Sequence, residues 1–395
     1  MAKFQHIALI VLSLIFVFSG CRKSEFVLEE TEKVINDNGL GTGTTTWTKD
    51  KEYIIEGKVY VNDGQVLTIE AGTVVKARQG SGTAASALIV ARGGKIIAEG
   101  TAVDPIIFTA ESDDLEGSLS INDNGLWGGL IILGSASVNT PTGEAHIEGI
   151  QTSEPRGIFG GNNDEDNSGI LRYVSIRHGG TDLGKGNEIN GLTLGGVGSG
   201  TTINNIEVIA NADDGIEVFG GTVNLKNIVV ANCDDDAMDI DLGYRGKGQF
   251  WCLIQNSNYG DKLIEIDGGE EIKTARPYTT PSIYNVTGVG RGSIYSNKII
   301  SFNDNAGSVI ANSVFINQKE GIEIEYSSVR NNSYTQWKDG NLQVKNNIFY
   351  NVNDNQVENF FSIYPLNNED VTDEQLLMDN YFDRKRGGRC KSILI

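Results

Sequence analysis

NADDGIEVFGG, at residues 211–221, and NCDDDAMDIDLG, at residues 232–243, are two copies of one pattern about 21 residues apart. In each copy an acidic turn is followed by a strand-like alternation, in which Glu217 or Asp239 stands between two aliphatic residues. Successive side chains of a strand point to opposite faces, so these carboxylates lie on the face opposite the aliphatic side chains. The pattern predicts short strands with one buried face, repeated along the chain.

The alternation recurs at residues 263–269, around Glu265, and at residues 321–326, around Glu323. Further strand-like segments lie at residues 202–211, 223–232, 250–256 and 307–317. Short strands at this period, with Gly, Asn or Asp at the corners, are typical of a β-solenoid, whose coils stack and share one core. Stacking predicts an outward acidic column of Glu217, Asp239 and Glu265, interrupted before Glu323.

Composition agrees with this fold class and limits the partners. The chain has 49 Gly and only 6 Pro, and its net charge is -20 at pH 7. That charge argues against nucleic acid and anionic lipid, and it favours cations or neutral glycans. A solvated acidic surface without a specific partner is the alternative.

The N-terminus predicts the compartment. Lys3 lies in a short head, residues 7–18 are apolar, and Ser19 and Gly20 precede Cys21. The segment resembles the signal peptide of a bacterial lipoprotein, which implies a lipid on Cys21 and a place at the outer membrane, on its periplasmic or surface face. An ordinary cleaved signal or an uncleaved anchor is the alternative.

The predicted domains are a signal peptide at residues 1–20, a lipidated Cys and tether at 21–45, a β-helix at 46–365 and a C-terminal tail at 366–395. Roughly 300 residues at about 22 to 26 per coil predict roughly 12 to 14 coils.

The run from Gly57 to Ala110 resembles the opening coils of right-handed parallel β-helix proteins of the pectin-lyase-like kind. Residues 126–139, 157–180, 213–223 and 234–250 resemble a narrower group, envelope lipoproteins common in Bacteroidota. The resemblance implies an all-β, right-handed parallel β-helix solenoid. It implies no particular activity, because function belongs to sites rather than folds.

Catalytic candidates are few. Pectin-degrading hydrolases on this scaffold use three aspartates with a nearby His and an Arg-x-Lys, and no His follows Asp235 here. Asp239 and Asp241, two residues apart on one face, are a weak candidate pair for inverting hydrolysis. Arg177 and His178, which end a strand, are weak candidates for the base of a lyase, although such residues usually only bond a neighbouring turn.

Metal binding has two candidate sites. The loop at residues 164–169 offers oxygens from Asp164, Asp166 and Ser168, as the first half of a calcium loop does. The other candidate is the acidic column, with its ligands drawn from Glu217, Asp239, Asp241 and Glu265. Like charges stacked across strands are destabilising, so the column predicts a cation such as Ca²⁺, a raised pKa or a basic neighbour.

A ligand-binding face is predicted where acids and aromatic residues alternate. The residues assigned to it are Asp213, Asp214, Asp234, Asp235, Trp251 and Tyr244, with Trp127 and Phe219 on the same exposed sheet. Aromatic rings beside carboxylates suit sugar binding, although in a solenoid they more often stack for stability.

The sequence favours a non-enzymatic envelope lipoprotein that binds glycan or cations, or that serves as a surface adhesion or structural module. The first alternative is a polysaccharide lyase or glycoside hydrolase acting on uronate-containing glycans. The second is a purely structural spacer.

Overall fold

The computed structural model describes residues 32–80, 82–181, 188–256, 258–269, 272–356, 358–385 and 393–394. The chain divides into two units, residues 1–31 and residues 32–395, and the second contains the strands. The predicted signal peptide and Cys21 lie outside the described residues. In the described part of the chain, no helix is long and apolar enough to cross a membrane.

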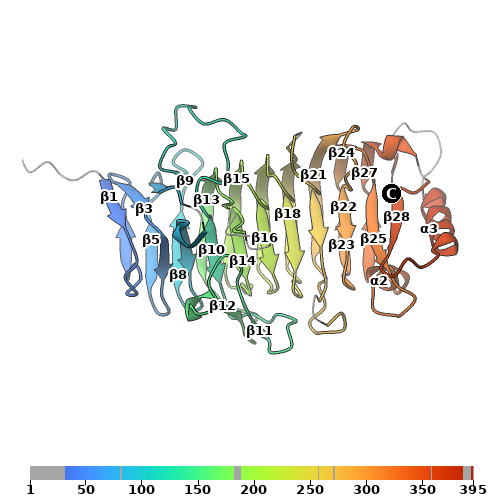
Figure 1. Ribbon diagram of the computed structural model, residues 1–395, viewed down its shortest axis with the longest axis horizontal. Helices are drawn as coiled ribbons and strands as arrows, with labels where there is room; N and C mark the ends of the chain where they lie inside the picture. Colours follow the sequence, from blue (N-terminus) through green and yellow to red (C-terminus); the bar gives the residue numbers. More distant parts are fainter. Residues whose placement is uncertain are drawn as a thin grey trace, which may run out of the picture. The chain divides into compact units, whose positions relative to one another are not determined.

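One sheet of ten parallel strands runs the length of the second unit, with one strand from each coil (Figure 1). Its strands are β4 (Lys58–Val61), β7 (Ala87–Val90), β10 (Leu130–Leu133), β14 (Leu192–Gly195), β16 (Ile216–Phe219), β18 (Met238–Asp241), β20 (Ile264–Ile266), β22 (Ile300–Phe302), β25 (Ile322–Tyr326) and β28 (Phe361–Pro365).

The other walls of the solenoid form a second sheet of seventeen strands. These are β1 (Glu32–Ile35), β2 (Thr45–Trp47), β3 (Glu52–Ile55), β5 (Val66–Ile69), β6 (Val74–Ala77), β8 (Lys95–Glu99), β9 (Ile106–Ala110), β13 (Gly169–Arg177), β15 (Thr202–Ile209), β17 (Asn224–Ala231), β19 (Lys247–Ile254), β21 (Ser282–Gly292), β23 (Ser308–Ala311), β24 (Val314–Gln318), β26 (Leu342–Lys345), β27 (Ile348–Val352) and β29 (Ile393–Leu394). Their pairings are parallel except for β29, which runs antiparallel to β27. The predicted all-β parallel β-helix is confirmed.

Three features differ from the prediction. The ten-stranded sheet gives fewer coils than the predicted 12 to 14, because some coils contain long insertions: Leu130 pairs with Leu192, and Ile322 with Phe361. One insertion carries an antiparallel hairpin of β11 (Glu144–His146) and β12 (Ile158–Gly160). Residues 32–45, assigned to the tether, already include β1, which pairs with β3.

Helices are few and lie mainly at the C-terminal end (Figure 1). They are α2 (Ser333–Lys338), α3 (Thr372–Lys385) and the short 3₁₀ turns η1 (Gly82–Ala84), η2 (Pro155–Gly157) and η3 (Asn353–Asn355). Phe382 of α3 stacks on Phe361 of the last coil with ring centroids 3.5 Å apart. The helix therefore covers the apolar end of the stack, which a solenoid must cap.

A left-handed backbone residue divides each long strand in the middle of the second sheet. Asn205, Asn227 and Asn285 have φ near +60°, and Phe250 of β19 occupies the same register position with φ 60°. The residue shifts the phase of the alternation, so Trp251 points into the core and Cys252 points outward. The sequence analysis placed Trp251 on the outward face, which is the wrong one.

The left-handed backbone at residue 250 is less favourable for Phe than for the Asn residues that occupy the equivalent position in neighbouring coils. We therefore expect Phe250→Asn to stabilise the fold. Asn tolerates the left-handed region, where other L-residues lose roughly 1 to 2 kcal/mol, and the Phe250 side chain is 48% exposed, so little packing is lost. We expect the free energy of unfolding to rise by about 1 kcal/mol in chemical denaturation. The reverse change one coil earlier, Asn227→Phe, should lower it. A less stable Phe250→Asn would mean that packing of the ring outweighs the strain.

Candidate cation-binding site

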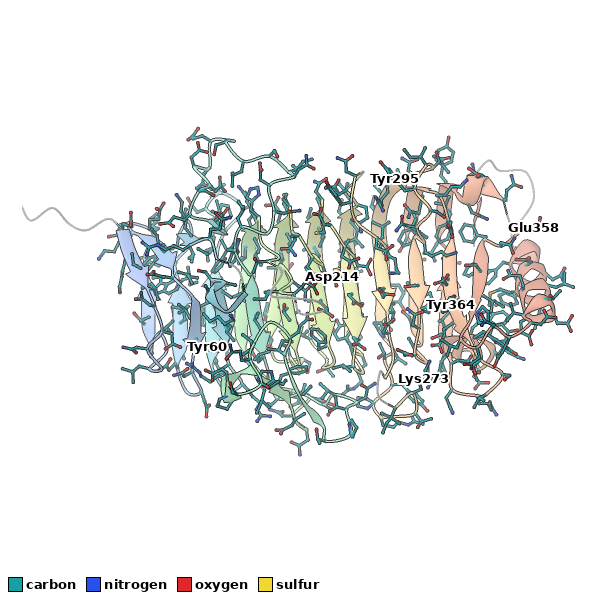
Figure 2. The ribbon with its side chains drawn as sticks, in the orientation of Figure 1. Tyr60, Asp214, Lys273, Tyr295, Glu358 and Tyr364 are labelled. Carbon is teal, nitrogen blue, oxygen red and sulfur yellow. The ribbon has the colours of Figure 1, made fainter. Side chains whose placement is uncertain are left out.

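Acidic turns lead into three consecutive strands of the ten-stranded sheet. Asp213 and Asp214 precede β16, Asp235 and Asp236 precede β18, and Asp261 precedes β20. The three strands pair in register, so the turns stack one above another. Figure 2 shows Asp214 near the middle of the solenoid.

The strands continue this stack with the predicted column. Glu217 pairs with Asp239, and Asp239 pairs with Glu265. Glu265 then pairs with Ser301, and Ser301 with Glu323, so a serine fills the predicted interruption. The register inferred from the sequence is therefore observed.

The column is less exposed than predicted. Glu217 is only 8% exposed, because the insertion before β14 brings Asn190 and Glu148 onto it. The amide Nδ2 of Asn190 donates to Glu148 Oε1 at 3.0 Å and also to Glu217 Oε2. Asn190 is fully buried, and its Oδ1 has no hydrogen-bond partner.

Carboxylate oxygens converge in three overlapping trios, within each of which they lie within 4.8 Å of one another. The trios are Asp213, Asp214 and Asp235; Asp214, Glu217 and Asp239; and Asp235, Asp236 and Asp261. Ca²⁺ binds oxygen ligands at about 2.3 to 2.6 Å, so two ligands of one ion lie at most about 5 Å apart. The spacing within each trio therefore fits a shared cation.

The third trio contains a cation of its own. Lys262 Nζ lies 2.6 Å from Asp261 Oδ2, 3.0 Å from Glu265 Oε2 and 3.6 Å from Asp236 Oδ2. Among the described residues, no Lys or Arg forms an ion pair with Asp214 or with the other members of the first two trios. Among the described residues, the two trios that share Asp214 therefore have no ion-paired cation of their own.

The pKa values of these carboxyl groups are raised. Burial, and then the neighbouring carboxylates Glu148, Glu188 and Asp235, raise the pKa of Asp213 to about 8. Burial also raises the pKa of Asp267 to about 7, with Glu265 adding to it. Burial and neighbouring carboxylates also raise the pKa of Asp235 to about 6. The same two causes raise the pKa well above its usual range in Asp214, Glu217, Asp236 and Asp239. Without a cation, these carboxyl groups hold protons more tightly than free carboxyl groups do.

Hydrogen bonds keep the central carboxylates in place. The backbone N–H of Asp236 donates to Asp214 Oδ1 at 2.8 Å, which links one coil to the next. Within the described residues no protein donor reaches Asp214 Oδ2, and the buried Oδ1 of Asp239 also has no donor. Within the described residues, hydrogen bonds therefore leave these two oxygens unpaired.

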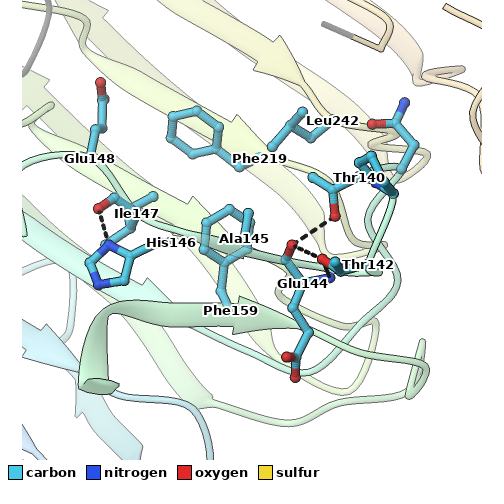
Figure 3. A pocket seen from close by; sticks show the side chains of 12 residues that line it. Thr140, Thr142, Glu144, Ala145, His146, Ile147, Glu148, Phe159, Phe219 and Leu242 are labelled. Carbon is cyan, nitrogen blue, oxygen red and sulfur yellow. Dashed lines mark hydrogen bonds between the residues drawn. The ribbon is translucent and has the colours of Figure 1, made fainter. Parts of the chain in front are cut away.

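A pocket adjoins the cluster between the β11–β12 insertion and the ten-stranded sheet (Figure 3). Its volume is about 460 Å³, and Glu148, Phe219 and Leu242 are among its lining residues. Phe219 follows Glu217 by two residues on β16, so the two side chains share a face of the sheet. The pocket and the cluster therefore lie side by side.

The predicted calcium loop has protein partners instead. Asp164 accepts from Ser137 and forms an ion pair with Arg245 at 2.6 Å. Burial acts to raise the pKa of Asp164, but the hydrogen bonds from Arg245 and Ser137 outweigh it and lower the pKa. Asp166 accepts from the hydroxyls of Ser135 and Ser168. These donors use the oxygens that the sequence offered to Ca²⁺, so the loop is the weaker candidate.

The weak catalytic candidates lie on different walls. Arg177 ends β13 in the second sheet, where its guanidinium contacts Ser175 and Glu207. His178 follows it with φ 60°, and its Nδ1 bonds the backbone carbonyl of Asp123. Asp239 and Asp241 belong to β18 of the ten-stranded sheet, so the structure does not bring the two pairs together.

The predicted aromatic face is wrong. Trp127, Trp251 and Tyr244 are fully buried, whereas Phe219 borders a pocket. Trp251 Nε1 donates to the carbonyl of Leu225, and the Tyr244 hydroxyl donates to that of Val223. Trp251 and Tyr244 therefore hold neighbouring coils together inside the core and cannot contact a surface ligand.

Three predicted acidic residues stand apart from the trios. Asp234 is half-buried, and Asp241 is buried in register with Phe219. Glu265 contacts Lys262, Ser301 and Asn303. Sequence reasoning missed Asp236 and Asp261, which the repeat could have revealed because they occupy the same turn as the predicted acids. Nothing in the sequence signalled Asn190 or Glu148, which an insertion brings to the site.

Comparison with known proteins agrees with the fold. Residues 39–380 match the family model described as a pectate-lyase-like β-helix domain. No curated protein matches the sequence. Among solved structures the chain is similar to the Dettilon tailspike protein, at 13% identity and a TM-score of 0.36, and the match covers 82% of this chain and 62% of that protein's length. Because the family model matches most of its length, the chain belongs to the pectate-lyase-like β-helix domain family.

Proposed function

We propose that this protein is a cell-envelope lipoprotein whose β-helix binds a divalent cation, Ca²⁺ above all, in the two trios that share Asp214, and binds glycan beside it. The observation that carries the proposal is the convergence of Asp213, Asp214, Glu217, Asp235 and Asp239 within 4.8 Å in each trio, with no ion-paired Lys or Arg among the described residues. Carboxylate oxygens are hard ligands, which Ca²⁺ prefers.

The third trio supports the same interpretation. There the ammonium group of Lys262 lies among Asp236, Asp261 and Glu265, where a cation would otherwise be needed. The ammonium group of Lys262 thus compensates one trio, whereas the other two have no ion-paired Lys or Arg among the described residues. Asn190 Oδ1, which is buried and unpartnered beside Glu217, adds a neutral oxygen of the kind that completes a Ca²⁺ shell.

The place in the cell rests on the sequence before the solenoid. A short apolar run, small residues and Cys21 support a lipid anchor at the outer membrane, with the acidic sheet presented to the periplasm or the exterior. A tethered, cation-loaded surface of this kind suits an adhesion or structural module that holds glycan.

Asp214→Asn is the direct test of the cation site. Asp214 belongs to both trios, so its loss should abolish the rise in melting temperature that Ca²⁺ gives the wild type. A ligand that binds only the folded state stabilises it by about 2.7 kcal/mol at a hundredfold excess over Kd. Asn retains the Oδ1 that accepts from Asp236, so the fold should persist.

Asp234→Asn is the matched control, because Asp234 lies in the corresponding turn of the next coil, beside Asp235, but outside the trios. It should keep the full response to Ca²⁺. A wild type that millimolar Ca²⁺ does not stabilise would contradict the proposal.

A hydrolase or lyase is the second candidate, and one observation favours it. The carboxylate oxygens of Asp213 and Asp235 lie within 4.8 Å of each other, and the pKa of Asp213, about 8, is raised further than that of Asp235, about 6, a difference that suits an acid beside a base. Incubation with uronate-containing polysaccharides should then release reducing ends or unsaturated products, and Asp213→Asn should stop the release. If the protein binds the glycan but releases no product, the result supports the binding function.

A further inference from the structure

The pocket beside the cation cluster combines an apolar floor with hydrogen-bond acceptors. Phe159 and Phe219 lie with ring centroids 5.9 Å apart, and Leu242 continues the apolar surface (Figure 3). Phe219 comes from the sheet and Phe159 from the β11–β12 insertion, so the pocket exists only where the insertion meets the coils. An apolar, partly aromatic floor is the surface on which the C–H face of a sugar ring packs.

Most polar groups on the wall are already engaged. The hydroxyls of Thr140 and Thr142 donate to the carbonyl of Glu144 at 2.8 Å, and the Glu144 carboxylate pairs with Arg92. Both ring nitrogens of His146 bond backbone carbonyls, those of Ile147 and Glu154. These groups hold the hairpin and are not open to a ligand.

Unlike these groups, the side chain of Asn139 has an atom without a hydrogen-bond partner. It is 3% exposed and lines the pocket, and its Oδ1 has no hydrogen-bond partner. Its Nδ2 donates to the carbonyl of Gly268 at 3.2 Å, which fixes the orientation of the amide and leaves Oδ1 as an acceptor. A buried acceptor without a donor costs free energy unless a ligand supplies one.

The charged residues that line the pocket determine whether it favours neutral or anionic sugars. The lining residues include Glu144, whose carboxylate pairs with Arg92, and Glu148, but no Lys or Arg, so the wall itself offers no cation to a carboxylate or sulfate inside the pocket. Hydroxyl groups can donate to Asn139 Oδ1. A volume of about 460 Å³ lies within the range of small-ligand pockets.

We propose that this pocket is a subsite for an uncharged pyranose ring, which packs on Phe219 and donates a hydroxyl hydrogen to Asn139 Oδ1. The inference rests on the glycan binding proposed above, and it names the sugar class that the pocket takes. Because Glu217 and Phe219 share one face of β16, a glycan seated here also reaches the edge of the cation cluster.

The test measures binding of the full chain, in detergent, to arrays of neutral hexose oligosaccharides and of uronate oligosaccharides. We expect the wild type to bind neutral oligosaccharides, Phe219→Ala to weaken that binding about tenfold, and Phe219→Leu to weaken it less. Asn139→Ala should also weaken it severalfold. Phe250→Ala, which removes a half-exposed phenylalanine from the other sheet, is the matched control and should bind as the wild type does.

The Ca²⁺-dependent rise in melting temperature, measured on the same variants, separates this inference from the cation site. Phe219→Ala should keep that rise, which also shows that the variant is folded. Neutral glycans that fail to bind while the rise persists would overturn the pocket assignment alone, as would binding that Phe219→Ala leaves unchanged. Loss of both the rise and all glycan binding in the wild type would overturn the proposed function as well.

Discussion

In the presence of a chelator, the melting temperature is expected to fall as the pH rises from about 5 to about 8, a direction opposite to ordinary acid denaturation. The cause is the acidic cluster. Its folded-state pKa values exceed those of the unfolded chain, reaching about 8 for Asp213 and about 6 for Asp235. Between the unfolded value, about 3.9 for Asp, and the folded value, the folded state binds more protons.

The sign follows from that difference. Where the folded state binds more protons than the unfolded state, the free energy of unfolding decreases with rising pH. The stabilisation is fully present below the unfolded pKa and is lost as the pH passes through the folded pKa values. Each pH unit over which the folded state holds one extra proton corresponds to about 1.4 kcal/mol, or about 2 °C for a chain of this length. Asp213 alone holds its extra proton over most of the range from about pH 5 to about pH 8, so the fall should amount to about 5 °C.

Ca²⁺ should reverse the trend, because a cation stabilises the ionised carboxylates that the protons otherwise neutralise. The rise that Ca²⁺ produces should be larger at about pH 8 than at about pH 5, where protons compete for the same oxygens. Thermal melts at several pH values, in chelator and in Ca²⁺, measure both effects.

General charge repulsion in a chain of net charge -20 also grows with pH, and salt separates it from the cluster. At about 1 M salt the screening length is about 3 Å, which suppresses surface repulsion but not a buried cluster. Asp214→Asn should flatten the pH dependence. A melting temperature in chelator that rises with pH would show that the carboxylates are not strained as inferred.

Register and fold could be predicted from the sequence because both follow from side-chain alternation. Glu217, Asp239 and Glu265 stack as expected, since the coils that carry them have similar lengths and a slip of one residue would bury their charges. The acidic turns were found for the same reason, because they recur at a fixed distance before each strand.

The residues that bury Glu217 from outside the repeat could not be predicted from the sequence. Asn190 and Glu148 reach Glu217 from segments outside the repeat, and no pattern relates them to it. The orientation of Trp251 was missed because one left-handed residue, Phe250, inverts the alternation and has no sequence signal of its own. Local exceptions to the repeat thus decide which acids are buried and which aromatic residues reach the surface.

Lys262→Met is expected to convert the third trio into a cation site. Burial lowers the pKa of Lys262, but Asp236, Glu265 and Asp261 outweigh it and raise the pKa, so the ammonium group is held charged among them. Removing one partner of a largely buried ionic group typically costs about 3 to 5 kcal/mol. In chelator, the variant should therefore unfold at a much lower temperature than the wild type.

Ca²⁺ should then restore most of the loss, because the oxygens of Asp235, Asp236 and Asp261 already lie within 4.8 Å of one another. The gain from Ca²⁺ should exceed that of the wild type, since one more site is available. Titration of Ca²⁺ against the melting temperature, with calorimetric counting of bound ions, measures both.

Lys273→Met supplies the control. Lys273 lies 2.7 Å from Asp304 and also pairs with the buried Glu325, so its loss should destabilise the fold as well (Figure 2). Asp304 and Glu325 are not part of a carboxylate trio in the described residues, so Ca²⁺ should not rescue this variant beyond the wild-type response. Rescue of both variants would show a general effect of ionic strength, and rescue of neither would mean that the spacing of the trios does not suffice to bind a cation. Rescue of Lys262→Met alone would show that the solenoid places carboxylates at cation-binding distance and that the identity of one side chain decides whether the charge comes from the protein or from solution.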